Sequence, residues 1–177
     1  MSMAKSKAIW LFLGLGVGVL IGLAVLIFRD LSPVDEQFIP SPGATLPNFS
    51  AQDLDGNPVS LDQVAGKPIL INFWASWCQP CMEELPYLQQ IYEQFGGDLI
   101  VIGINADDTL SDMRAVADEL RLTFPVWHDQ QGAISREMLI SALPTSYFID
   151  PNGRILASYI GIVNDSIVEK YFPAGGE

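Results

Sequence analysis

The hydrophobic residues of this chain fall into short, almost unbroken runs that alternate with amphipathic stretches. Runs such as 69–74 and 99–105 are apolar at nearly every position, which predicts strands buried on both faces of a sheet. The stretches after them repeat apolar residues every three or four positions, the spacing of a helix with one buried face. This alternation predicts an α/β domain with helices on both faces of a central sheet. The expected strands are 69–74, 99–105, 124–127, 145–149 and 155–160, and the expected helices are one from 79 onward, 110–122, 134–139 and 166–172.

Two turn signals add hairpins to this pattern. Residues 55–57 read Asp-Gly-Asn and lie between the short apolar segments 49–51 and 59–61, which predicts a hairpin before the first central strand. Residues 151–153 read Pro-Asn-Gly and separate the last two expected strands. They predict an antiparallel hairpin at one side of the sheet.

A separate apolar segment precedes the domain. Residues 8–28 are apolar or glycine throughout, which is about the length that crosses a bilayer as a helix. Lys5 and Lys7 come before this segment and Asp30 comes soon after it, so the positive-inside rule places residues 1–7 in the cytoplasm. The expected location is therefore the cell membrane, with a single pass and the domain outside. A cleaved signal peptide is the alternative, but the apolar segment is long for one.

The remaining chain divides into a tether and one domain. Residues 29–43 contain proline and serine without periodicity, which predicts an extended linker. Residues 44–177 have the size of one compact domain with its own core. The protein has 177 residues and a formal net charge of −12, and all its acidic residues lie after position 28. This charge makes nucleic acid a poor partner for the exported domain.

The only two cysteines of the chain, Cys78 and Cys81, lie where the strand 69–74 gives way to a helix. The thiolate is the reactive form of cysteine, and a helix that begins near Cys78 stabilises it through unpaired N–H groups and the helix dipole. Pro80 supports a helix start here, because the first turn needs no N–H at that position. We therefore expect Cys78 to be the nucleophile and Cys81 to resolve the mixed disulfide. The spacing predicts thiol–disulfide exchange.

A metal site is the alternative interpretation of this pair. Zinc normally takes four ligands, and the sequence offers one C-x-x-C pair and a single histidine, His128, with no second cysteine pair. No metal and no cofactor are therefore predicted. A copper or zinc metallochaperone that uses Cys78, Cys81 and His128 stays open as a function of a different class.

The cysteine segment also carries a family resemblance. Residues 73–81 read FWASWCQPC and are followed at a distance by Leu143, Pro144 and Thr145 before a strand, which resembles the thioredoxin superfamily. The apolar segment, the early hairpin, and an added strand and helix before Pro144 are similar to the TlpA/ResA/CcmG group of membrane-anchored thiol–disulfide oxidoreductases. The resemblance covers residues 44–172. It implies a thioredoxin-like fold with an N-terminal hairpin and an inserted strand–helix unit, preceded by one transmembrane helix.

The resemblance also implies residues that contact a substrate. Pro144 is expected to carry a cis peptide bond, an isomer that only X-Pro bonds reach at modest cost, and to lie against the cysteine pair. Together with Leu143 it is expected to present backbone to an extended substrate segment. Trp77 is expected either on an apolar rim that receives substrate proteins or packed against the domain.

Two residues depart from the family pattern. Asn72 occupies the strand position where thioredoxins proper have a buried aspartate, and Gln79 replaces the glutamate that ResA-like sequences have between the cysteines. The proton acceptor for Cys81 is then Glu84 or water, because a base must lie within hydrogen-bond reach. The alternative for Glu84 is a solvated acid that complements the start of the helix.

The function implied by the resemblance is reduction of disulfides in exported proteins. The implied client is apocytochrome c, and the implied electron source is a thiol carrier in the membrane. An oxidant or isomerase uses the same nucleophile in another net direction, and the reduction potential decides between them. Peroxiredoxin chemistry is a third enzymatic alternative, although a W-C-x-x-C context is unusual for a peroxidatic cysteine.

Overall fold

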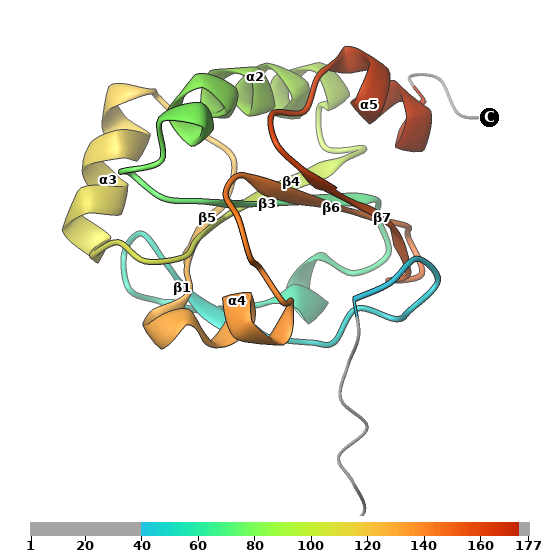
Figure 1. Cartoon of the computed structure of the whole chain (residues 1–177), viewed down its shortest axis with the longest axis horizontal. Coiled ribbons are helices and arrows are strands. Elements are labelled where there is room, and N and C mark those ends of the chain that lie inside the picture. Colours follow the sequence, from blue (N-terminus) through green and yellow to red (C-terminus); the bar gives the residue numbers. More distant parts are fainter. Residues whose placement is uncertain (1–39, 174–177) are drawn as a thin grey trace, which may run out of the picture. The chain divides into compact units, whose positions relative to one another are not determined.

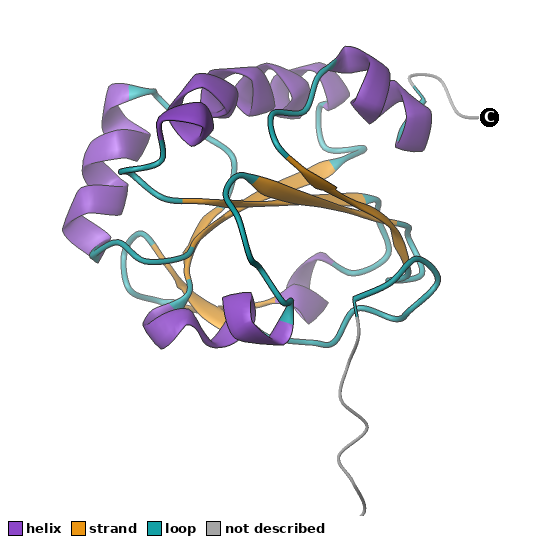
Figure 2. Cartoon of the chain, in the orientation of Figure 1, coloured by secondary structure: helices purple, strands orange, loops and turns teal. Residues whose placement is uncertain are grey.

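Residues 40–173 are described by a computed structural model. They form a 7-stranded mixed sheet in the order β2-β1-β5-β4-β3-β6-β7. Figure 2 shows this sheet as a central layer with helices on both sides. The strands are β1 (Ser50–Asp53), β2 (Pro58–Ser60), β3 (Ile69–Trp74), β4 (Ile100–Asn105), β5 (Val126–His128), β6 (Thr145–Ile149) and β7 (Ile155–Ile160), and the α-helices are α2 (Gln79–Phe95), α3 (Leu110–Glu119), α4 (Ala133–Glu137) and α5 (Asp165–Tyr171).

The strand directions bring several chain segments to one edge of the sheet. β3, β4 and β5 run parallel, so their carboxyl ends meet at the same edge. β6 runs antiparallel to β3, so its first residue lies at that edge as well, with Phe73 opposite Thr145. The loops that leave β3 and β4 and the loop that enters β6 are therefore neighbours, although they are far apart in the sequence.

Both faces of the sheet are covered, as the apolar runs predict. On β3 the side chains of Leu70 and Trp74 belong to a buried cluster with α2, α3 and α5, whereas Ile71 and Phe73 belong to a second cluster on the opposite face with α4. Figure 1 shows α2, α3 and α5 on one side of the sheet and α4 on the other. Burial of each large apolar side chain contributes about 1.5–3 kcal/mol, so the position of β3 is strongly determined.

The predicted α/β architecture and both hairpins are confirmed, with differences at element ends. The helix expected over 110–122 stops at Glu119, because Arg121 has a positive φ of 52° and the N–H of Leu122 turns back to the carbonyl of Ala117. The strand expected from 124 begins at Val126, since Pro125 has no N–H to give to a ladder. β5 is the added strand between the active-site helix and Pro144, and α3 and α4 flank it along the chain.

The expected membrane helix at 8–28 and most of the expected linker at 29–43 lie outside the described residues. Between residues 40 and 173, no helix is both long enough and apolar enough to span a bilayer. The single-pass anchor therefore stays a prediction.

Candidate active site

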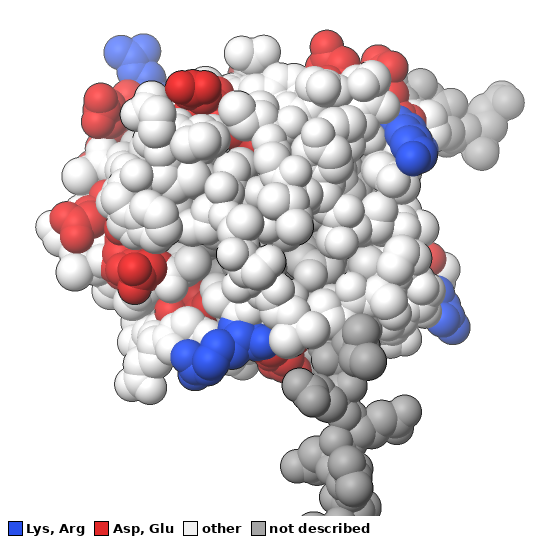
Figure 3. Space-filling model, viewed as in Figure 1, with Lys and Arg blue, Asp and Glu red and all other residues white. Residues whose placement is uncertain are grey.

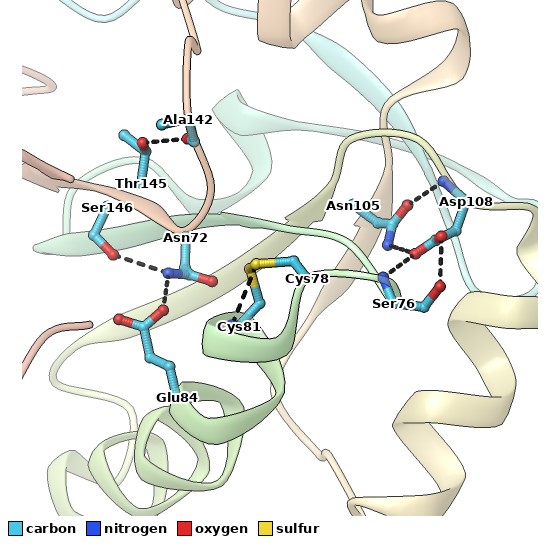
Figure 4. The surroundings of a disulfide bond; sticks show 10 residues. All are labelled: Asn72, Ser76, Cys78, Cys81, Glu84, Asn105, Asp108, Ala142, Thr145 and Ser146. Atoms are coloured by element: carbon cyan, nitrogen blue, oxygen red, sulfur yellow. Dashed lines mark hydrogen bonds between the residues drawn. A yellow bond between two sulfur atoms is a disulfide. The ribbon is translucent and has the colours of Figure 1, made fainter. Parts of the chain in front are cut away.

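The two cysteines form a disulfide at the amino end of α2, with their Cα atoms 5.3 Å apart (Figure 4). Cys78 is the N-cap residue, and its Sγ accepts the backbone N–H of Cys81 at 3.3 Å. Pro80 lies in the first turn, where its missing N–H leaves no bond unmade. Cys78 retains 5% of its surface and Cys81 none, so Cys78 is the more accessible cysteine. This is the geometry expected of a nucleophile and a resolving cysteine.

The loop between β3 and Cys78 is held by a residue that sequence reasoning missed. One oxygen of the Asp108 carboxylate accepts the N–H of Ser76 at 2.6 Å, and the other accepts the Ser76 hydroxyl at 2.7 Å (Figure 4). Asn105, the last residue of β4, accepts the N–H of Asp108 at 2.8 Å and donates its amide to the same carboxylate. The only sequence signal was an Asn that ends a buried strand and an Asp three positions later, at the edge that also holds the cysteines.

The predicted cis peptide bond between Leu143 and Pro144 is confirmed. Pro144 is buried, and its carbonyl accepts the N–H of Gly161 at 2.9 Å, which joins the loop before β6 to the end of β7. Neither the N–H nor the C=O of Leu143 makes a hydrogen bond to another group in the part of the chain that the structure describes. These two groups are available to an incoming polypeptide.

Exposed apolar side chains lie next to Cys78 in the chain and next to the Pro144 loop in the sheet. Trp77, directly before Cys78, is 65% exposed, so it lies on a rim and not in the core, whereas Trp74 is fully buried. Ile160 is 62% exposed and lies opposite Thr145 in the β6–β7 ladder, and Ile162 follows it with 42% exposed. We call the exposed Trp77, Ile160 and Ile162, together with the half-buried Leu143, the apolar rim.

Glu84 is fully buried, so its interpretation as a solvated acid at the helix start is wrong. It lies one turn beyond Cys81 on α2. Its Oε1 accepts the N–H of Val163 at 2.7 Å, and its Oε2 accepts the side-chain amide of Asn72 at 2.8 Å. The same amide nitrogen of Asn72 donates to the hydroxyl of Ser146 at 2.9 Å (Figure 4). The site therefore contains a buried polar network beneath the disulfide.

Burial raises the pKa of the Glu84 carboxyl above its ordinary value, because the charged form loses hydration. The hydrogen bonds from Val163 and Asn72 favour the charged form and lower the same pKa, but by less than burial raises it. A carboxyl group with a raised pKa accepts and releases protons closer to neutral pH than an exposed one.

His128, the other residue considered for metal binding, lies apart from this network. It ends β5 opposite Asn105, and it lines a polar pocket of about 450 Å³ together with Asp107, Ser135 and Arg136. Its Nδ1 is buried and has no partner among residues 40–173. Within the same residues, no three His, Cys, Asp or Glu side chains are arranged to hold a metal ion.

Comparison with known proteins places this site in a family. The model of the AhpC/TSA family matches residues 42–158. The chain belongs to the AhpC/TSA family. A thiol-disulfide oxidoreductase ResA from Oceanobacillus iheyensis is 34% identical over 145 residues, which is 77% of this chain and 74% of that protein. The thioredoxin-like protein YneN from Bacillus subtilis is 34% identical over 131 residues, which is 72% of this chain and 76% of that protein.

A solved structure agrees with this assignment. The thioredoxin domain of a thiol-disulfide oxidoreductase from Bacteroides vulgatus superposes with a TM-score of 0.66 at 28% identity, over 74% of this chain and 97% of that one. Together with the Cys78–Cys81 disulfide, these relatives identify this member of the AhpC/TSA family as a thiol–disulfide oxidoreductase of the ResA type. The resemblance to the ResA group and the thioredoxin-like fold are thus confirmed.

The raised pKa of Glu84 gives the oxidised protein a specific pH dependence. Because the pKa in the folded state lies above the unfolded value of about 4.3, the contribution of Glu84 to stability is complete below that pH and declines as the pH rises through the folded pKa. Glu84→Gln removes this titration. We expect the free energy of unfolding of the wild type to fall, relative to that of Glu84→Gln, as the pH is raised from about 4 to about 8, measured by denaturant titration.

Glu83→Gln is the matched control, because Glu83 is the neighbouring acid on α2 and is exposed. This variant keeps Glu84, so its free energy of unfolding should still fall over the same pH range. If the profile of Glu84→Gln also ran parallel to the wild type, Glu84 would titrate with the same pKa in the folded and unfolded states.

Proposed function

We propose that this oxidoreductase reduces disulfides in exported proteins through the Cys78–Cys81 dithiol. The observation that carries the proposal is the arrangement at one edge of the sheet: the more accessible cysteine lies at a helix start, and the loop with the unpaired backbone of Leu143 enters β6 at the same edge. An extended protein segment is the substrate that suits this surface, because it brings both apolar side chains and unpaired backbone groups.

The first step is attack on the client. The Cys78 thiolate, stabilised by the amino end of α2, attacks one sulfur of the client disulfide. The client S–S bond breaks, a new bond joins Cys78 to the client, and the second client sulfur leaves as a thiolate that takes a proton from solvent. Ser76 and Asp108 hold the loop that positions Cys78 during this step.

The second step resolves the mixed disulfide. We assign Glu84 as the acceptor of the Cys81 thiol proton, since it is the buried acid one turn along the same helix. The Cys81 sulfur then attacks Cys78, and the remaining client sulfur leaves as a thiolate that takes a proton from solvent, while Glu84 releases its proton to solvent. The enzyme ends with the Cys78–Cys81 disulfide, and the client has gained two electrons and two protons.

The client-binding surface is assigned to the apolar rim together with the cis Pro144 loop. The N–H and C=O of Leu143 would pair with the client backbone, while Trp77 and Ile160 contact side chains next to the client cysteine. On the face shown in Figure 3, no charged side chain covers the loop that joins α4 to β6. An uncharged surface accepts unfolded segments of varied sequence.

Trapping tests the two cysteine roles. Cys81→Ser removes the resolving thiol, so mixed disulfides between Cys78 and clients should accumulate in cells and appear as adducts on non-reducing gels that disappear with reductant. Cys78→Ser is the control and should form no such adducts, because the remaining thiol is fully buried. Equal adduct formation by both variants would contradict the assignment of Cys78 as the nucleophile.

The reduction potential tests the direction of the reaction. We expect the Cys78–Cys81 couple, equilibrated with thiol buffers, to lie near or below the roughly −270 mV of thioredoxin. The reduced enzyme should then reduce a disulfide-bonded C-x-x-C-H peptide, the haem-attachment motif of apocytochrome c. A potential near −120 mV would instead make the enzyme an oxidant.

A reductant of exported proteins also needs electrons from the cytoplasm, and a membrane thiol carrier is the proposed donor.

Location is the remaining part of the proposal. We propose that residues 8–28 anchor the enzyme in the cell membrane with its domain outside. Alkaline phosphatase becomes active only where disulfides form, so fusing it after residue 43 should give activity in the membrane fraction. Activity in the soluble exported fraction would show cleavage of the segment, and an inactive fusion would place the domain in the cytoplasm. The same fusion without residues 1–39 is the control and should be inactive.

A further inference from the structure

The side-chain oxygen of Asn72 is a buried acceptor without a donor. Asn72 is fully buried in the middle of β3, and its Oδ1 has no hydrogen-bond partner anywhere in residues 40–173. A buried carbonyl oxygen left without a donor destabilises the protein, and such atoms are rare in native proteins. This one therefore calls for a physical explanation.

The orientation of the amide is determined by its other end. The Nδ2 group donates to Oε2 of Glu84 at 2.8 Å and to the hydroxyl of Ser146 at 2.9 Å, so both amide hydrogens are used. Turning the amide over would place its oxygen against a carboxylate oxygen, and both atoms are acceptors. The network thus directs Oδ1 away from Glu84.

Oδ1 is turned toward the disulfide. Figure 4 shows the amide oxygen of Asn72 on the side of the Cys78–Cys81 sulfurs, with the amide nitrogen on the side of Glu84 and Ser146. The arrangement agrees with the chain path, because Asn72 belongs to the face of β3 that α2 covers, and α2 carries both Cys81 and Glu84. In the disulfide form neither sulfur has a hydrogen to donate.

We propose that Oδ1 of Asn72 accepts a hydrogen bond from the Cys81 thiol when the disulfide is reduced. Reduction adds two electrons and two protons to the pair, and the proton that Cys81 takes up supplies the missing donor. Asn72 itself exchanges no electron and no proton. In the oxidised protein this buried oxygen has no donor, whereas in the reduced protein the Cys81 thiol supplies one. This difference shifts the equilibrium toward the dithiol. Asn72 is a positioning residue that tunes the redox equilibrium and keeps Cys81 protonated until resolution.

Infrared spectroscopy tests the hydrogen bond directly. In Cys78→Ser the Cys81 thiol is the only one in the chain, so its S–H stretching band reports on this site alone. We expect the band at a lower frequency than that of a free thiol in an apolar solvent, because hydrogen bonding weakens the S–H bond. A band at the free-thiol frequency would overturn the proposal, and this measurement does not depend on replacing Asn72.

The thiol–disulfide equilibrium gives a second, independent test. Asn72→Leu removes the oxygen and keeps a similar volume, so the equilibrium constant with a thiol buffer should move toward the disulfide by about threefold to tenfold. In Cys78→Ser/Asn72→Leu the S–H band should return toward the free-thiol frequency. An unchanged equilibrium constant in Asn72→Leu would contradict the proposal.

Ser146→Ala is the matched control. Ser146 is buried in the same network but contacts the nitrogen of the Asn72 amide, so its loss leaves Oδ1 in place. This variant should lose stability in both redox forms with little change in the equilibrium constant. A shift in Ser146→Ala as large as that in Asn72→Leu would show that the effect comes from the network as a whole and would overturn the specific role of Oδ1.

Discussion

The site depends on one constraint, which is the burial of β3 on both faces. All six residues of Ile69–Trp74 are buried, and the clusters above and below determine which side chains face α2. The strand therefore ends at a defined place beneath the start of α2, and Cys78 caps the helix there. The position of the nucleophile therefore follows from core packing. Both cysteines of the chain belong to the redox pair, so the core positions Cys78 without the help of a structural disulfide.

The mixed sheet extends this constraint to residues far away in sequence. Parallel β3 and β4 bring Asp108 beside the loop that precedes Cys78, and antiparallel β6 brings the Leu143–Pro144 bond to the same edge. Asp108 holds the loop that precedes Cys78 through its hydrogen bonds to Ser76. The Leu143–Pro144 loop presents the unpaired N–H and C=O of Leu143. The active site thus lies at the edge where three chain segments meet, the loops that leave β3 and β4 and the loop that enters β6, and the sheet topology brings them together.

Sequence reasoning succeeded where the signal was local. The strand before the cysteines, the helix start at Cys78 and the Pro144 loop each follow from short patterns or from a recognisable motif. It could not decide between a proton acceptor and a solvated helix-start acid at Glu84, because the partners that bury it, Val163 and Asn72, lie 79 and 12 positions away. Asp108 escaped notice for the same reason, since it contacts Ser76 across 32 positions. Such contacts between distant parts of the chain decide whether a polar residue is buried, and the hydrophobic pattern of the sequence does not reveal them.

The network beneath the disulfide shows how the chain manages without a buried aspartate at position 72. A carboxylate there would direct negative charge toward the sulfurs and oppose the thiolate by like charge. This chain instead carries the acid on the helix, at Glu84, and an uncharged amide on the strand. The amide's nitrogen stabilises the acid while its oxygen faces the sulfurs. In this arrangement Glu84 exchanges the proton and Asn72 accepts the hydrogen bond from the thiol. The hydrogen bond between Asn72 and Glu84 holds the two side chains in position.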